Sequence, residues 1–150
     1  MVLPITPHVA DITALLEETG QYPNIDLLIL HAATNDVARE SADKVIEKLR
    51  ILETELQTQN SKSIAISSVC CRKNVNTHRR VRLVNAAIKL ICNRNNWHYI
   101  DNSNIGIDSI GADGIHPNEQ GIELLHQNFQ KSILDIRSSC FPLTQKTNTL

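Results

Sequence analysis

The sequence predicts an α/β domain in which a parallel sheet is covered by helices on both faces. Short runs rich in Ile, Leu and Val alternate with longer segments whose apolar residues recur every three or four positions. Short, continuous apolar runs are typical of strands buried on both faces, whereas the longer spacing is typical of amphipathic helices. Alternation of the two along one chain favours right-handed strand–helix–strand units.

The predicted elements follow in the order helix, strand, helix, strand, helix, strand, loop, helix. The first helix is expected over residues 7–19, with Thr6 as N-cap, Pro7 at the first helical position and Gly20 at its end. The three strands are expected over residues 25–32, 63–69 and 97–100. The other helices are expected over residues 41–59 and 77–93 and from the residue after Pro117-Asn118. Residues 1–3 are a candidate for a further strand.

Composition limits the class of protein. The 150 residues suit one domain, with 41% hydrophobic and 21% charged residues, and the 3% of aromatic residues imply an aliphatic core. A net charge of −1 excludes the strongly basic surface of a dedicated nucleic-acid binder. No apolar run approaches the roughly 20 residues of a membrane helix. The N-terminus lacks a signal-peptide pattern and the four cysteines form no disulfide framework, so a reduced, cytoplasmic protein is expected.

Polar residues follow each predicted strand. Ligands of open parallel sheets bind beyond the carboxyl ends of the strands, so these residues are expected to meet on one rim. They are His31, Thr34, Asn35 and Asp36 after the first strand, Cys70, Cys71, Arg72 and Lys73 after the second, Asp101, Asn102 and Ser103 after the third, and Asp113 and His116 in the next loop.

Asp113 and His116 lie three residues apart in a predicted loop, where a carboxylate and an imidazole can meet side by side. The carboxylate would select the imidazole tautomer and stabilise its protonated form, which is the base half of a nucleophile–base–orienter triad. Asn35 could donate its amide to an oxyanion. The plainer interpretations are an Asp cap beside a surface histidine, and an Asx-type turn that closes the strand at Asn35-Asp36.

Together the two motifs resemble the SGNH (GDSL-type) hydrolases. Residues 28–37 (LILHAATNDV) resemble the family's third block, a strand followed by Gly-x-Asn-Asp, and residues 113–121 (DGIHPNEQG) resemble its fifth block, Asp-x-x-His before a helix. The resemblance implies a three-layer, flavodoxin-like fold and hydrolysis of esters in small or acylated substrates by a serine nucleophile, without metal or cofactor. It implies that His116 is the general base, Asp113 its orienter and Asn35 an oxyanion donor, with Asp36, Ala33 and Thr34 in supporting positions.

The chain also departs from the family pattern. The first block, Gly-Asp-Ser after the first strand, has no match, and Thr6 or Pro7 stands where the second block has glycine. Ala33 replaces the glycine of the third block. We therefore expect a truncated domain over residues 1–137 that lacks its first strand, an open sheet edge beside residues 25–32, a polar tail over 138–150, and little or no activity. Cys70 or Cys71 is the alternative nucleophile, because Ser67 and Ser68 lie within a strand.

A second interpretation is a noncatalytic SGNH-like module that binds RNA or a protein partner. It depends on a basic group that follows the second strand, composed of Arg72, Lys73, Arg79, Arg80 and Arg82. A solvated helix face explains the same residues. A metal site is not expected, because the histidines and cysteines lack paired ligand spacing.

Overall fold

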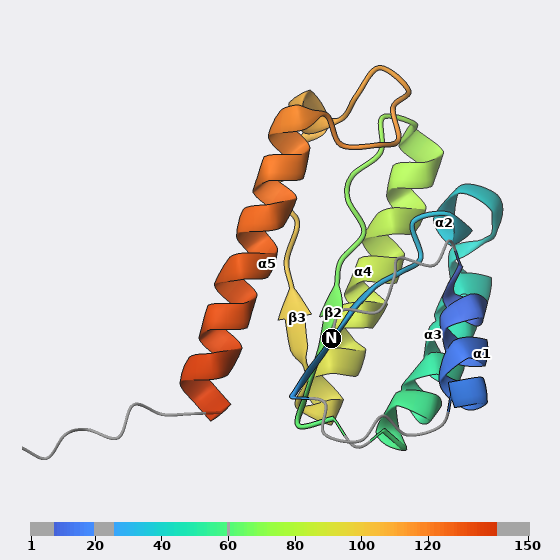
Figure 1. Cartoon of the computed structure of the whole chain (residues 1–150). Coiled ribbons are helices and arrows are strands. Elements are labelled where there is room, and N and C mark those ends of the chain that lie inside the picture. The colour runs from blue at the N-terminus through green and yellow to red at the C-terminus, as the bar shows by residue number, and fades with distance from the viewer. Residues whose placement is uncertain (1–7, 20–25, 60, 141–150) are drawn as a thin grey trace, which may run out of the picture.

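The computed structural model describes residues 8–19, 26–59 and 61–140. These residues form a three-layer α/β structure, with α5 on one face of a small sheet and α3 and α4 on the other (Figure 1). The strands are β1 (Leu27–His31), β2 (Ser63–Ser67) and β3 (His98–Ile100). The helices are α1 (Val9–Thr19), α2 (Asp36–Arg39), α3 (Ala42–Gln57), α4 (Val75–Asn95), the short 3-10 helix η1 (Ile107–Ser109) and α5 (Glu119–Cys140).

The sheet is parallel and partial. Its order is β1-β2-β3, with Leu28 opposite Ile64 in the first pair and Ile66 opposite Tyr99 in the second. Within the described ranges β1 pairs on one side only, as the predicted open edge requires. The candidate strand at residues 1–3 lies outside the described residues, as do Thr6, Pro7 and Gly20.

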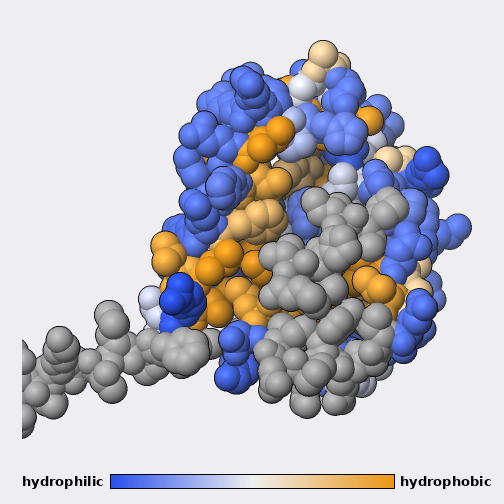
Figure 2. All heavy atoms as spheres, viewed as in Figure 1, coloured by the Kyte–Doolittle hydropathy of each residue, from blue (hydrophilic) through white to orange (hydrophobic). Residues whose placement is uncertain are grey.

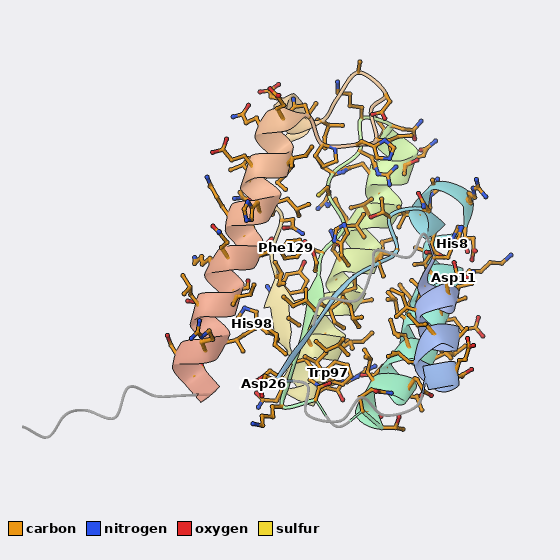
Figure 3. The ribbon with its side chains drawn as sticks, viewed as in Figure 1. His8, Asp11, Asp26, Trp97, His98 and Phe129 are labelled. Atoms are coloured by element: carbon orange, nitrogen blue, oxygen red, sulfur yellow. The ribbon has the colours of Figure 1, made fainter. Side chains whose placement is uncertain are left out.

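Alternation along β1 divides the core into two layers. Leu28 and Leu30 join the larger cluster beneath α1, α3 and α4, whereas Ile29 packs in a second cluster with Ile136 of α5. Phe129 projects from α5 toward the strands and packs against this second cluster (Figure 3). Hydrophobic surface extends along the inner side of α5 (Figure 2). Both faces of the strand are therefore apolar, which explains its continuous apolar sequence.

The predicted helices are present, with different boundaries. Helix α4 begins at Val75 rather than near Thr77, because Asn74 is its N-cap and accepts a hydrogen bond from the Thr77 N–H at 3.0 Å. Helix α5 continues to Cys140, past the predicted start of the polar tail at residue 138. The short helices α2 and η1 were not predicted, because neither is long enough to show helical periodicity. No helix in the described ranges is long and apolar enough to cross a membrane.

Candidate active site

The loop that carries His116 is held at both ends. The Gly111 N–H donates to the His116 carbonyl at 2.7 Å, and the Asn118 side chain donates to the Asp108 carbonyl at 2.9 Å. Asn118 also accepts from the Gly121 N–H at 3.0 Å, which caps the start of α5. These contacts fix the backbone of the loop against η1 and α5.

Gly121 allows the closest approach in this region. A Cβ atom at Gly121 would lie 2.3 Å from the Ser109 carbonyl oxygen and 2.8 Å from the Pro117 Cβ. Real Cβ atoms do not come so close to a backbone oxygen. Only glycine therefore allows the first turn of α5 to pack against η1 in this way.

Asp113 and His116 meet as the spacing predicted. His116 Nδ1 lies 2.6 Å from Asp113 Oδ2, while Asp113 Oδ1 accepts the backbone N–H groups of Ile115 and His116 at 2.9 and 3.0 Å. The hydrogen bond to His116, helped by these two amides, holds the pKa of the Asp113 carboxyl far below its usual range. The pair is exposed, with 70% of the His116 side chain accessible. The contact between Nδ1 and the Asp113 carboxylate orients the imidazole, and it leaves Nε2 available for proton transfer.

His116 borders a pocket of about 230 Å³ at the carboxyl end of β1 and β2. The pocket brings together residues from three separate segments of the chain. They are His31, Ala32, Thr34 and Asn35 from the end of β1, Val69, Cys70 and Arg72 from the segment after β2, and Ile115, His116, Pro117 and Leu125 from the last loop and α5.

The turn after β1 places Asn35 at this pocket. Ala33 has φ +71° and is fully buried, and its carbonyl accepts the Val37 N–H at 3.1 Å. The left-handed conformation favours glycine, so alanine here costs about 1 kcal/mol. Asn35 stands at the N-cap position of α2, yet its side chain caps nothing there. The Ala33 carbonyl, and not an Asx-turn through the Asn35 side chain, closes the backbone here, and Asn35 lines the pocket.

Asp36 points away from the pocket and joins three helices. It is fully buried, and its Oδ2 accepts the Val9 N–H at 3.0 Å. Its Oδ1 lies 3.5 Å from His8 Nδ1 and 3.8 Å from Lys48 Nζ. His8 lies at the start of α1, on the side near α2 (Figure 3). The carboxylate thus connects the N-terminus of α1 to α2 and α3 behind the turn that carries Asn35.

His31, predicted as a rim residue, also makes an inward hydrogen bond. Its Nδ1 lies 2.9 Å from Ser67 Oγ, which accepts the Asn102 side-chain amide at 2.7 Å. The ring meets Phe129 edge-on at 6.0 Å, and burial lowers the pKa of His31. The sequence analysis missed the His31–Ser67 contact. The contact depends on the register of β1 and β2, which places the two residues opposite each other and which the local sequence does not show.

The two cysteines differ in position and neither is an activated thiol. Cys70 lines the pocket but is 7% exposed, and burial raises its pKa to about 11. The Cys71 thiol donates to the Ile105 carbonyl at 3.1 Å, and its pKa is also raised by burial. Thiolates are the nucleophilic form, so both environments oppose the alternative in which a cysteine replaces the serine.

The rim contains two pockets, so the expectation that all its polar residues meet at one site is wrong. Asp101, Asn102 and Ser103 line a separate pocket of about 380 Å³ beside α4, together with Cys71 and His78. The segment after β2 lies between the two pockets. Cys70 and Arg72 line one and Cys71 lines the other, as the alternation of an extended backbone requires.

The predicted basic group does not form one surface. Arg72 is buried in the pocket, whereas Lys73, Arg79 and Arg82 are exposed. Arg80 is half-buried and donates to Thr77 Oγ1 at 3.2 Å. In the part of the chain that the structure describes, no cluster of three His, Cys, Asp or Glu residues could hold a metal ion.

No protein-family model matches the chain, and no curated protein is similar to it in sequence. Its structure, however, is similar to those of several esterases. An acetylxylan esterase, Axe2 from Geobacillus stearothermophilus, has a TM-score of 0.71 at 20% identity, over 84% of this chain and 67% of the esterase. A member of the lipolytic G-D-S-L family from Veillonella parvula has a TM-score of 0.66 at 20% identity, over 83% and 73%.

The M. smegmatis aryl esterase also has a TM-score of 0.66, at 15% identity, over 85% of this chain and 67% of the esterase. The fold is therefore that of the SGNH/GDSL hydrolases, as the sequence motifs predicted. At these identities the likeness establishes the fold alone.

Proposed function

We propose that the His116 pocket is the acid–base and oxyanion side of an SGNH-type acyl-ester hydrolase site. The observation that carries this proposal is the 2.6 Å contact between His116 Nδ1 and Asp113 Oδ2 at the mouth of a pocket that Asn35 also lines. His116 is the general base, Asp113 orients it and Asn35 donates to the oxyanion. Asp36 braces the turn from behind, and Ala33 and Thr34 shape it.

The arrangement suits acyl transfer. His116 Nε2 would take a proton from the attacking water and return it to the leaving group, while Asp113 stabilises the imidazolium that forms between these steps. The Asn35 amide would stabilise the charge that develops on the carbonyl oxygen. The small pocket, with apolar side chains at Ile115, Pro117 and Leu125, suits a short acyl group. The esterase neighbours support small acylated compounds as the substrate class.

The described lining of the pocket contains no serine that could act as the nucleophile. The sequence contains no Gly-Asp-Ser, and in the described lining of the pocket Thr34 is the only hydroxyl and Cys70 the only thiol. Removal of the serine from such a triad costs on the order of 10⁶-fold in turnover. We therefore propose that this chain by itself hydrolyses esters only slowly, through direct attack of a water molecule that His116 deprotonates.

Hydrolysis of p-nitrophenyl acetate tests the proposal. We expect slow, saturable hydrolysis that falls at least about tenfold in His116→Ala and in Asn35→Ala, because the base and the oxyanion donor still contribute. Cys70→Ala and the exposed His126→Ala control should match the unaltered chain. Equal rates in the unaltered chain and His116→Ala would disprove the assignment. A loss of rate in Cys70→Ala would show instead that Cys70 is the nucleophile.

The second candidate function is a noncatalytic SGNH-like module that binds RNA or a protein partner. The buried guanidinium of Arg72 lines the pocket and could hold an anionic group of such a partner. Contact with RNA through the exposed Lys73, Arg79 and Arg82 stays a prediction. An RNA affinity that falls steeply with salt would support it, because phosphate contacts release counterions.

A further inference from the structure

Arg72 is buried, and none of the described carboxylates is paired with it. Arg72 is only 4% exposed, whereas the other described Lys and Arg residues are half-buried or exposed. Its Nη2 donates to the Thr34 carbonyl. No carboxylate oxygen of the described residues lies within 4.0 Å of its guanidinium, whereas the buried Glu53 is paired with Arg94 at 2.6 Å.

A buried cation of this kind requires compensation. Charged groups in protein interiors are paired or hydrogen-bonded, because loss of water otherwise disfavours the charge strongly. Arginine remains charged at all relevant pH values, and its planar guanidinium presents five N–H donors that match a carboxylate. The Thr34 carbonyl is one neutral acceptor, so it satisfies only a small part of this capacity.

The guanidinium borders the pocket rather than the closed core. Arg72 lines the same 230 Å³ space as His116 and Asn35, and Asp113, the nearby carboxylate, is bound to His116 and does not line it. The lining of the same pocket also includes the apolar residues Ile115, Pro117 and Leu125. The site therefore combines one fixed positive charge with a short hydrophobic wall.

We infer that this pocket binds a small apolar carboxylate, with its carboxylate on the Arg72 guanidinium and its hydrocarbon part against Ile115, Pro117 and Leu125. The inference uses the pocket of the proposed hydrolase site, but the binding does not depend on hydrolysis. If the site does hydrolyse esters, the acid released would be such a carboxylate, and Arg72 would retain it as a competitive inhibitor.

Titration of the ¹⁵N-labelled chain with butyrate and with butyramide, followed by NMR, tests the inference. The two ligands have similar shape and differ in charge. We expect butyrate to shift the resonances of the pocket residues saturably, with a Kd at least about tenfold lower than that of butyramide, because a charge-assisted hydrogen bond is worth more than a neutral one. Arg72→Gln should abolish this preference. Arg79→Gln removes an exposed cation of α4 and should leave it unchanged.

Arg72→Lys provides the test if Arg72→Gln does not fold. It keeps the charge but loses the planar pair of donors, so the preference for butyrate should fall about threefold or more. Equal affinity for butyrate and butyramide in the unaltered chain would overturn the inference, as would a preference that survives loss of Arg72. Hydrolysis is measured separately. Butyrate binding without His116-dependent turnover would leave this inference standing, and turnover without butyrate binding would leave only the proposed function.

Discussion

Two histidines border the same pocket, and each makes a hydrogen bond with a side chain of the kind found in hydrolase triads. His31 contacts Ser67 at 2.9 Å, inside the sheet, and Ser67 is fully buried. His116 contacts Asp113 at 2.6 Å, in an exposed loop. The first pair has the hydroxyl and the second has the carboxylate. Neither pair alone is a complete triad.

The comparison shows that a hydrogen-bonded Ser–His pair is not by itself a catalytic pair. Ser67 Oγ already accepts from Asn102 and has no exposed surface, so substrate cannot reach it. Burial also lowers the pKa of His31, which favours the neutral form of the ring. Access to solvent and a carboxylate partner distinguish His116 from His31, and both features favour a general base.

The largest expected effect concerns the packing that holds the exposed pair. Gly121→Ala should lower the free energy of unfolding by about 3 kcal/mol, because the new Cβ would clash with the Ser109 carbonyl. On helix propensity alone, the same change in α5 would raise the free energy of unfolding by about 1 kcal/mol. The sign of the measured change in this free energy therefore shows which of the two effects is larger. Gly106→Ala is the control, since nothing lies within 4 Å of its added Cβ. Urea denaturation measures both variants, and a stabilised Gly121→Ala would contradict the packing.

The buried pair should contribute to stability through its network. Ser67→Ala removes the hydroxyl that contacts both His31 and the Asn102 amide, and it should cost about 1–2 kcal/mol. Ser138→Ala, an exposed change on α5, is the control and should cost nothing measurable. If Ser67→Ala were as stable as the unaltered chain, the His31–Ser67 contact would be incidental.

The pH dependence of stability should separate the two histidine pairs. The pKa of His31 is lowered in the folded chain, so below about pH 6.5 the unfolded state takes up a proton that the folded state does not. Stability should therefore fall with decreasing pH in this range, by at most about 1.4 kcal/mol per pH unit for this group. His31→Gln should flatten the profile. The same slope in His31→Gln as in the unaltered chain would exclude His31 as its source.

The exposed pair should have a smaller effect on stability, in a more acidic range. The pKa of Asp113 is lowered in the folded chain, so its stabilising effect is present above about pH 4 and is lost as the pH falls below that value. Asp113→Asn should be slightly less stable than the unaltered chain at pH 7, and this difference should vanish in acid. Chemical denaturation at several pH values measures it. A difference that stays constant with pH would contradict this, because the ionised Asp113 carboxylate would then not be its source.

Much of the molecule was predictable because local patterns determine it. The apolar runs at β1 and β2 must be strands buried on both faces, and the three-residue spacing of Asp113 and His116 allows their contact within one loop. Asn35 was predictable as a pocket residue because polar residues that follow a parallel strand lie at its carboxyl edge.

Other features depend on contacts between distant segments. Nothing in the local sequence indicates that Asp36 receives the Val9 N–H, which lies 27 positions earlier in the chain. The separation of the rim into two pockets depends on which side of the chain Cys70 and Cys71 face after β2. The burial of Arg72 also depends on contacts between distant segments. From the sequence alone, an arginine next to a lysine is expected at the surface, but here the neighbouring segments enclose it.

The sequence by itself determined the α/β class, the order of the elements and the Asp113–His116 pair, because periodicity and short spacings act within a few residues of chain. Only the tertiary structure decided that His31 is bound to Ser67 and that Arg72 is buried in the His116 pocket. The physical reason is that burial and charge compensation depend on which segments pack together, and the pairing of β1 with β2 and the docking of the last loop set that packing.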